Sequence, residues 1–380
     1  MSLRLVTMES TMRANDLSRR ALLGGSAALA GAGMTGFIGR AAAAEILTMG
    51  IVYVGARDDF GWNQAHAIAA KALKAVPNVK VLEEERVPET TAVTKTMESM
   101  VKLDGAKLVL GTSFGYFDPF MIELARKFPD IEFRHSTMLW DPAKHPKNLG
   151  SYFCYIDQAH YINGVAAGLS TKSNKLGFIA PKTIGVVLRD VNSFAAGARK
   201  VNPNATVQLI VTGDWTLPVR EAEAANALID AGCDVIATRV DSPKVVLEAS
   251  EARGVKTTGH ATSQASLAPK GFITGAEMKW ETIYKNFAAT LAKGEKLPNV
   301  MEGGYDKDFV QNTPFGAGAT DAARVASMAA IAELRAGKPV FVGPIKSNTG
   351  KMISPTTLEL YDPSLWGTDY LVEGVVGSIT

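Results

Sequence analysis

The chain has 380 residues, of which 47% are hydrophobic and 21% charged, and its formal net charge is +2. Five of the 40 basic residues and two of the 38 acidic residues lie in the first 44 positions, so the remainder carries a net charge of −1. A nucleic-acid partner is therefore not indicated. The roughly 336 residues that follow exceed one ordinary hydrophobic core and predict two lobes.

Residues 1–44 are typical of a bacterial export signal. Ser18-Arg-Arg-Ala-Leu-Leu23 is a twin-arginine pattern, and the uncharged, glycine-containing run Ala21–Gly39 follows it. Arg40–Ala44 offers an A-x-A cleavage site, which would leave Glu45 as the first mature residue. The run is just long enough to span a membrane, but its glycines and the cleavage site favour a removed signal. We therefore predict an exported, periplasmic protein cleaved near Ala44.

Two cysteines remain, Cys154 in a strand-like segment and Cys233 at a helix-to-strand turn. Both segments are typical of a buried core, so we interpret the two cysteines as unpaired small apolar residues, although in an exported protein they could form a disulfide.

Short apolar runs alternate with amphipathic segments along the chain after residue 45, which predicts βαβ crossovers and parallel sheets. The expected strands are Ile46–Val54, Lys80–Val87, Leu108–Gly111, Glu132–Ser136, Gly150–Tyr155, Lys175–Ile179, Thr206–Val211, Val235–Thr238, Val255–Thr258 and Gly271–Gly275. The expected helices are Gln64–Val76, Thr90–Leu103, Pro119–Lys127, Asp157–Ser170, Val191–Val201, Val219–Ala231, Pro243–Arg253, Trp280–Lys293 and Asp321–Ala336. The series runs twice, which favours two doubly wound lobes with a cleft between them.

The segment Gly55-Ala-Arg-Asp-Asp-Phe-Gly-Trp-Asn63 follows the first expected strand, at the position where open α/β sheets bind ligands. It lacks the glycine patterns that hold phosphates, and its two acids would repel a pyrophosphate. Asp58 and Asp59 offer acceptors, Asn63 offers both a donor and an acceptor, and Trp62 offers a flat face. This set suits a flat polar ring. The alternative is a helix N-cap by Asp58 or Asp59 with a packed aromatic residue.

The same rule gives the other residues expected at the cleft. They follow later strands: Ser113, Phe114, His135–Thr137, Asp214, Trp215, Arg239–Ser242 (with Asp241), His260–Gln264, Lys279 and Trp280. Tryptophans at several strand ends indicate stacking on a flat ring, although tryptophan also fills interfaces between lobes.

Two other chemistries are considered. Gly111-Thr-Ser-Phe-Gly115 is a G-x-S-x-G pattern, and Asp241 and His260 follow in the chain order of a serine hydrolase. However, no oxyanion loop precedes that strand, and the next helix begins late, near Pro119. The five histidines form no metal-ligand pattern, so no metal site or cofactor is expected.

The chain resembles the BMP (basic membrane protein) family of bacterial substrate-binding proteins. The resemblance covers most of Leu47 to about Gly343, and its segments are Asp58–Gln64, Gly111–Gly115, Ser151–Phe178, Ala227–Ile236 and Gly271–Thr274. It implies a type I periplasmic-binding-protein fold of two Rossmann-like lobes on a three-segment hinge. The expected lobes are 45–154 with about 276–315, and 155–275 with about 316–343, and we expect the tail 344–380 to pack on a lobe.

The resemblance also implies a function, which is delivery of a purine nucleoside or nucleobase to the permease of an ABC importer, without catalysis. The residues matching the family's ligand contacts are Asp59, Asn63, Trp62 and Trp215. The family's later aspartate has no clear counterpart in Gly259–Gln264, and Lys279 matches the family's lysine with an offset of one residue. These departures fit a base-only ligand such as adenine, or another flat heterocycle such as a flavin. A sugar receptor of the same fold is a further alternative, and we expect a monomer.

Overall fold

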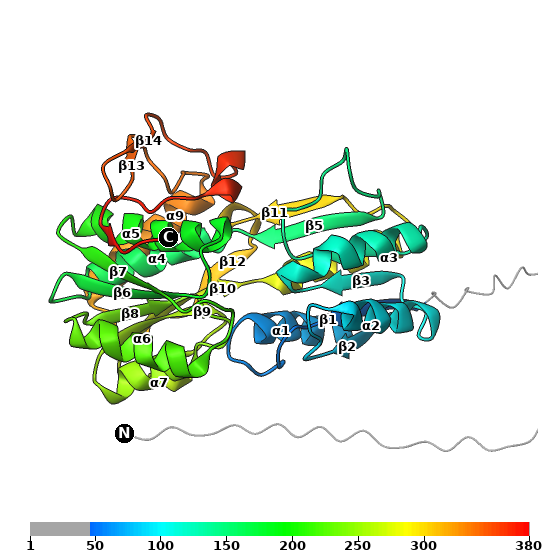
Figure 1. The fold of residues 1–380 in the computed structure, drawn as a ribbon, viewed down its shortest axis with the longest axis horizontal. Coiled ribbons are helices and arrows are strands. Elements are labelled where there is room, and N and C mark those ends of the chain that lie inside the picture. Colours follow the sequence, from blue (N-terminus) through cyan, green and yellow to red (C-terminus); the bar gives the residue numbers. More distant parts are fainter. Residues whose placement is uncertain (1–45, 380) are drawn as a thin grey trace, which may run out of the picture. The chain divides into compact units, whose positions relative to one another are not determined.

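The computed structural model describes residues 46–379, so the predicted export signal lies outside the described part. Two parallel-stranded sheets organise this part (Figure 1). In the first sheet the strands are, in spatial order, β11 (Val300–Gly303), β5 (Leu149–Cys154), β4 (Glu132–His135), β3 (Leu108–Gly111), β1 (Leu47–Val52) and β2 (Val79–Glu84). In the second they are β12 (Val310–Asn312), β10 (Phe272–Met278), β9 (Lys256–Ala261), β8 (Val235–Thr238), β6 (Lys175–Ala180), β7 (Thr206–Val211) and β15 (Val375–Val376).

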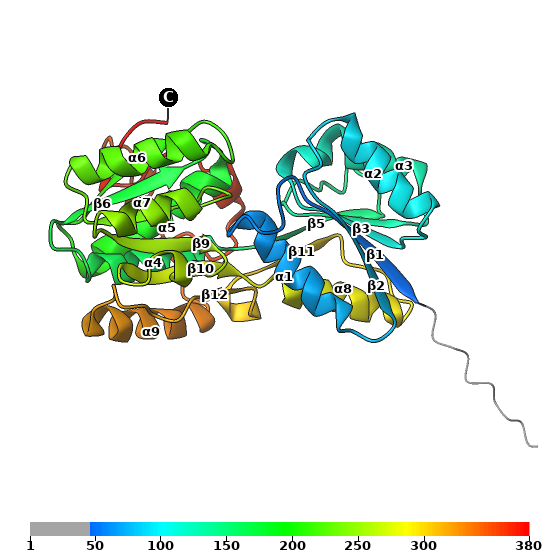
Figure 2. The ribbon, with the colours of Figure 1, turned by 90° about the horizontal axis from the view of Figure 1, so that it is seen from below.

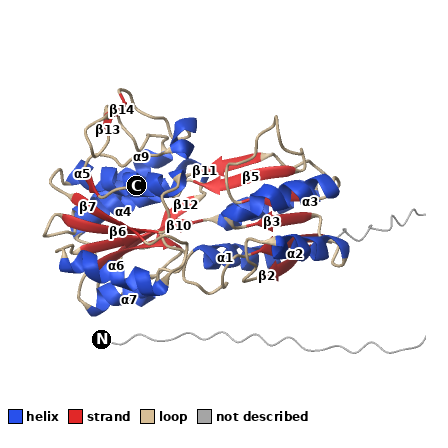
Figure 3. Cartoon of the chain, in the orientation of Figure 1, coloured by secondary structure: helices blue, strands red, loops and turns tan. Residues whose placement is uncertain are grey.

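Helices cover both faces of each sheet (Figures 2 and 3). On the first sheet, α1 (Trp62–Lys74) packs with α8 (Trp280–Ala292) on one face, and α2 (Thr91–Lys102) and α3 (Ile122–Lys127) cover the other. On the second, α6 (Pro218–Asp230) and α7 (Lys244–Ala252) form one layer, and α4 (Asp157–Gly168), α5 (Gly185–Val201) and α9 (Asp321–Arg335) form the other. The predicted α/β alternation is therefore observed, with most element ends within a few residues of those expected.

The chain passes between the two sheets three times: from β5 into α4, from β10 into α8, and from β11 into β12. The third crossing lies nearer the N-terminus than the sequence suggested. We assigned residues up to about 315 to the first lobe, but β12 pairs antiparallel with β10 in the second sheet, through Met278 and Val310. Strand β12 has only three residues, too few for a recognisable pattern.

The C-terminal tail contacts the second sheet and the crossing segments. Strand β15 pairs with β7, and a short hairpin joins β13 (Ile345–Lys346) to β14 (Met352–Ser354). The Trp366 ring packs on Phe153, and its indole Nε1 donates to the hydroxyl of Tyr155 over 2.9 Å. The tail therefore lies against the segment that leads out of β5. Cys154 and Cys233 are buried and unpaired.

Helices α4 and α5 approach each other closely because glycine lies at their contact. A Cβ added at Gly164 of α4 would lie 2.0 Å from the carbonyl oxygen of Phe194 in α5, and one added at Gly197 of α5 would lie 2.1 Å from the carbonyl oxygen of Tyr161. These backbone atoms cannot move without shifting a helix, so this layer depends on the absence of a side chain.

We expect Gly164→Ala to lower the free energy of unfolding by about 1–3 kcal/mol, because the added methyl group must push the two helices apart. Chemical denaturation of the purified protein measures this difference. The matched control is Gly367→Ala, where an added Cβ meets no heavy atom within 4 Å. Equal losses of stability in the two variants would contradict the argument from helix packing.

Candidate functional site

The loop after β1 uses its acidic side chain to hold itself together. The Asp59 carboxylate accepts hydrogen bonds from the backbone N–H groups of Gly61, Asn63 and Gln64 at 2.9–3.0 Å, and from the Asn63 side chain at 2.7 Å. The Asn63 amide oxygen in turn accepts from the backbone N–H of Gly55. Burial raises the pKa of Asp59, although these donors act in the opposite direction. Asp59 thus accepts from N–H groups of the first turn of α1, although the N-cap position itself is Gly61 and not Asp58 or Asp59, the positions that the sequence offered as the alternative.

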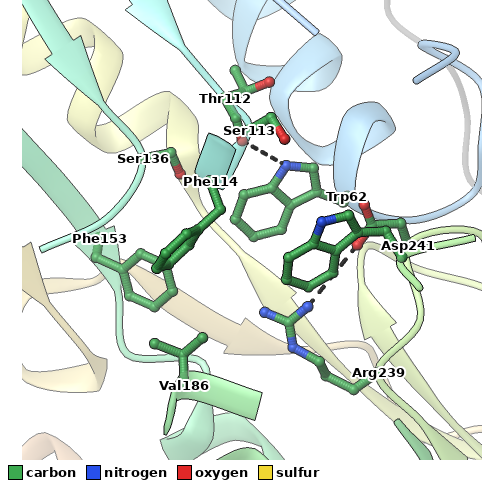
Figure 4. A pocket seen from close by; sticks show the side chains of 10 residues that line it. Trp62, Thr112, Ser113, Phe114, Ser136, Phe153, Val186, Arg239 and Asp241 are labelled. Carbon is green, nitrogen blue, oxygen red and sulfur yellow. Dashed lines mark hydrogen bonds and ion pairs between the residues drawn. The ribbon is translucent and has the colours of Figure 1, made fainter. Parts of the chain in front are cut away.

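This capped loop positions Trp62, the first residue of α1. The Trp62 side chain is only 8% exposed, and its indole Nε1 donates to the carbonyl oxygen of Thr112 over 2.9 Å. Its ring lies edge-on to His66 and Trp280, with centroid distances of 5.0 and 5.7 Å. Trp62 is therefore fixed on one side by the core, while another part of it borders a cavity (Figure 4).

The space in the cavity that the centre of a water-sized sphere can reach is only about 20 Å³, so the cavity is nearly closed and far smaller than an ordinary ligand pocket. Its lining comes from both sheets: Trp62, Thr112, Ser113, Phe114, Ser136, Phe153, Val186, Trp215, Arg239 and Asp241. Most of these residues follow the carboxyl ends of strands. In both sheets the strand order reverses beside the first strand, between β1 and β3 and between β6 and β8. Ligands of doubly wound sheets bind at such switch points.

The two lobes touch beside this cavity. The backbone N–H of Trp62 donates to the carbonyl oxygen of Asp241 over 3.1 Å, and the Gln264 side chain donates to the carbonyl oxygen of Phe60. A Cβ at Gly61 would lie 2.0 Å from the same carbonyl oxygen of Asp241. The lobes thus touch at one side of the cavity, which has too little free volume for a heterocycle while these contacts remain.

A second hollow, of about 530 Å³, adjoins the first. Trp215 and Asp241 line both, while Asp59, Asn63 and Glu89 line only the second. The predicted residues therefore fall into two adjacent groups at one interface.

Charged groups beside the cavity come from the end of β8 and from α5. The Arg239 guanidinium donates from Nε to Asp190 over 3.0 Å, and its Nη1 lies 3.9 Å from the Asp241 carboxylate. Burial raises the pKa of Asp190 to about 7 and that of Asp241 to about 8, against the lowering effect of Arg239. The Asp241 carboxyl therefore retains its proton to a higher pH than a solvent-exposed aspartate does.

Asp58, His260, Lys279 and Trp280, all predicted for the site, line neither hollow. Asp58 is exposed on the loop, and Lys279 forms an ion pair with Asp308. His260 is fully buried, and its Nδ1 lies 3.0 Å from Nε2 of His160. Trp280 is also fully buried, stacked on His66 at 4.5 Å. Their position after a strand was correct, but their side chains turn into the core or to a surface partner.

Sequence reasoning did not single out Arg239, although it placed Arg239–Ser242 at the cleft. Residues 239 and 241 are two apart after a strand, which could have indicated a shared face. Phe153 on β5 and Val186 on α5 carried no such signal, because an apolar residue in a strand or a helix usually fills the core.

The arrangement does not assemble a serine hydrolase. The Ser113 hydroxyl donates to Glu89 over 2.5 Å, and His260 interacts with His160 instead. Between residues 46 and 379, no group of three or more histidine, cysteine or acidic side chains could hold a metal ion. In the same range no helix has the length and apolar character needed to cross a bilayer.

Comparisons with known proteins agree with this geometry. The sequence model of the Bmp family, described as PnrA-like ABC transporter substrate-binding proteins, matches residues 46–314. A purine-binding protein of Brucella abortus is 32% identical over 340 residues, which cover 89% of this chain and 95% of that protein. A Haloferax volcanii protein, named provisionally as a glucose-binding protein of an ABC transporter, is 33% identical over 264 residues, 70% of this chain and 63% of that protein.

Solved structures with low sequence identity share the fold. A solute-binding protein of an ABC transporter from Conexibacter woesei superimposes with a TM-score of 0.65 at 22% identity, covering 77% of this chain and 97% of that one. A solute-binding protein from Aeropyrum pernix gives 0.65 at 16% identity, covering 78% and 94%. The predicted type I periplasmic-binding-protein fold is confirmed.

We expect the contribution of Asp241 to stability to fall as the pH rises from 5 to 9, measured against a variant that cannot ionise at this position. Its carboxyl pKa is near 3.9 in an unfolded chain and about 8 in the fold. Because the folded state binds this proton more tightly, the contribution is complete below about pH 4 and is lost as the pH rises through about 8. Asp241→Asn, which mimics the protonated form, should reduce the fall in melting temperature.

Thermal unfolding at pH 5, 7 and 9 measures this effect. The control is Asp58→Asn on the loop between β1 and α1, at an exposed side chain. If Asp241→Asn leaves the pH dependence as steep as in the unmodified protein, Asp241 does not retain its proton in the fold.

Proposed function

Because the chain belongs to the Bmp family of PnrA-like ABC transporter substrate-binding proteins, we propose that it binds a purine nucleobase or nucleoside in the cavity of Figure 4 and delivers it to a permease. The observation that carries this proposal is the lining of the cavity. Two indoles, Trp62 and Trp215, lie with Arg239 and Asp241 at the switch points of both sheets. Aromatic faces stack on flat rings, and the polar pair can read a ring edge. The purine-binding relative from Brucella supports the same ligand class.

The geometry favours a free base over a nucleoside. Lys279 and the segment around His260 occupy the positions at which the family resemblance implied ribose contacts. Lys279 instead pairs with Asp308, and His260 is buried beside His160.

The proposed mechanism is binding without turnover. The lobes close on the ligand about the three crossing segments, which buries the ring between side chains of both lobes. We place the protein in the periplasm, exported by the signal predicted in residues 1–44, as a monomer whose partner is the permease. Ser113 serves no catalytic role in this proposal, because its hydroxyl donates to Glu89. The proposal involves no cofactor or metal.

A sugar is the second candidate ligand, because the Haloferax relative is named for glucose. Indole faces also stack on sugar rings, so the lining alone does not separate the two. Calorimetric titration with adenine, hypoxanthine, adenosine, riboflavin, ribose and glucose tests the proposal, and mass spectrometry of the ligand retained on purification identifies a bound molecule. Binding of glucose or ribose but no purine would contradict the proposed ligand class.

We expect Trp215→Ala to weaken purine binding by about 1–3 kcal/mol, or roughly 5- to 150-fold, because stacking on the indole is lost. Trp215 is only partly buried, so this truncation affects the core less than one at Trp62. Calorimetry with the preferred purine measures the change. The control is Trp140→Ala, since Trp140 is also partly buried but packs beside the α2–α3 layer, away from the cavity. An unchanged affinity in Trp215→Ala would contradict stacking at this site.

A further inference from the structure

Arg239 has donors that the protein leaves unused. Its side chain is only 3% exposed, and its one hydrogen bond within the described chain runs from Nε to Asp190. The terminal nitrogens Nη1 and Nη2 make no hydrogen bond to residues 46–379, and the Asp241 carboxylate 3.9 Å from Nη1 is the nearest ion-pair partner. Buried charged groups are normally fully hydrogen-bonded, because an unmet donor keeps its desolvation penalty. The two terminal nitrogens of Arg239 belong to a residue that lines the cavity, where a ligand can supply the acceptor.

The terminal nitrogens of Arg239 lie close to the two indole rings of the cavity, where they can reach the edge of a stacked ring. The guanidinium carbon lies 5.9 Å from the centroid of the Trp62 ring and 5.6 Å from that of Trp215. Figure 4 shows the guanidinium end of Arg239 directed into the space that Trp62 and Asp241 also border. Because the guanidinium lies over both indole rings, and Lys182 also lies over that of Trp215, a flat ring has to stack on the indole surface beside the guanidinium, with its edge toward it.

The chemistry of the two terminal nitrogens discriminates between purines. A guanidinium presents two parallel N–H groups, which match a pair of neighbouring acceptors. In a 6-oxopurine, O6 and N7 are such a pair, and arginine binds them in bidentate fashion. In adenine the same edge carries N7 and the N6 amino group, which is itself a donor and would face a donor of the arginine.

We infer that Arg239 determines specificity and makes this protein a receptor for 6-oxopurines, such as hypoxanthine, xanthine or guanine, in preference to adenine. The two terminal nitrogens of Arg239 donate to O6 and N7, while Asp190 holds the guanidinium through Nε. This inference rests on the proposed purine-binding function and specifies its ligand. It replaces adenine, the base that the sequence alone suggested.

Calorimetry with hypoxanthine and adenine tests the inference on the unmodified protein. These bases differ at C6 and in the proton on N1, and we expect hypoxanthine to bind at least about tenfold more tightly. Equal or tighter binding of adenine would overturn the inference, while the proposed purine function would stand. If neither base binds, both the inference and the proposed function fail.

Variants connect the preference to Arg239. Glutamine offers one donor and one acceptor, the pair that suits N6 and N7 of adenine, so Arg239→Gln should abolish or reverse the preference. Arg239→Lys keeps the charge beside Asp190 but lacks the fork, so it should bind hypoxanthine with a reduced preference. The control is Arg220→Gln, because Arg220 bonds to the Thr212 carbonyl away from the cavity. A preference unchanged in Arg239→Lys would overturn the role of Arg239, even if Arg239→Gln does not fold.

Discussion

The buried ion pair between Asp190 and Arg239 fixes the polar side of the cavity. A guanidinium at this depth is costly to bury unless a carboxylate accompanies it, and Asp190 supplies that carboxylate from α5. The position of α5 depends in turn on its close contact with α4. At that contact Gly164 and Gly197 have no side chain, so the backbone of the other helix can approach each of them closely. The orientation of a ligand-facing group at the end of β8 is therefore set by the packing of two helices on one face of the second sheet.

The opposite side of the cavity depends on the Asp59 carboxylate, whose hydrogen bonds come from the protein itself. Asp59 accepts four hydrogen bonds from its own loop and the first turn of α1. Because the first N–H groups of a helix have no partner within the helix, this cap stabilises the start of α1. The cap holds Trp62 where its backbone meets Asp241 and its indole meets Thr112. Asp59, which the sequence suggested as a ligand contact, thus contributes to the site indirectly, by positioning Trp62.

The sequence predicted the fold well, because strand and helix periodicities extend over whole elements and connect in a repeated βαβ order. It also predicted the edge of each sheet at which the cavity lies. It could not predict where a side chain turns after its strand ends. Trp62 and Trp280 follow strands in the same way, yet one borders the cavity and the other stacks on His66 in the core. That difference arises from contacts between α1 and α8, which are more than 200 residues apart. The sequence placed Arg239 at the cleft, but the ion pair that orients its guanidinium involves Asp190 on α5, and the sequence did not predict that pair.

The C-terminal tail adds a constraint that connects the crossing segments to each other. The Tyr155 hydroxyl, just after β5, donates to Glu302 on β11 and accepts from the indole of Trp366. The Tyr361 hydroxyl accepts from the backbone N–H of Gly304, in the third crossing. Two of the three crossings are therefore hydrogen-bonded to the tail. The guanidinium of Arg189 on α5, one residue before Asp190, packs against the rings of both Tyr155 and Trp366, at 4.5 and 4.7 Å from their centroids. Helix α5 thus contacts both the crossing segments, through Arg189, and the guanidinium of Arg239, through Asp190. A movement of the lobes about the crossings therefore acts on the helix that positions Arg239.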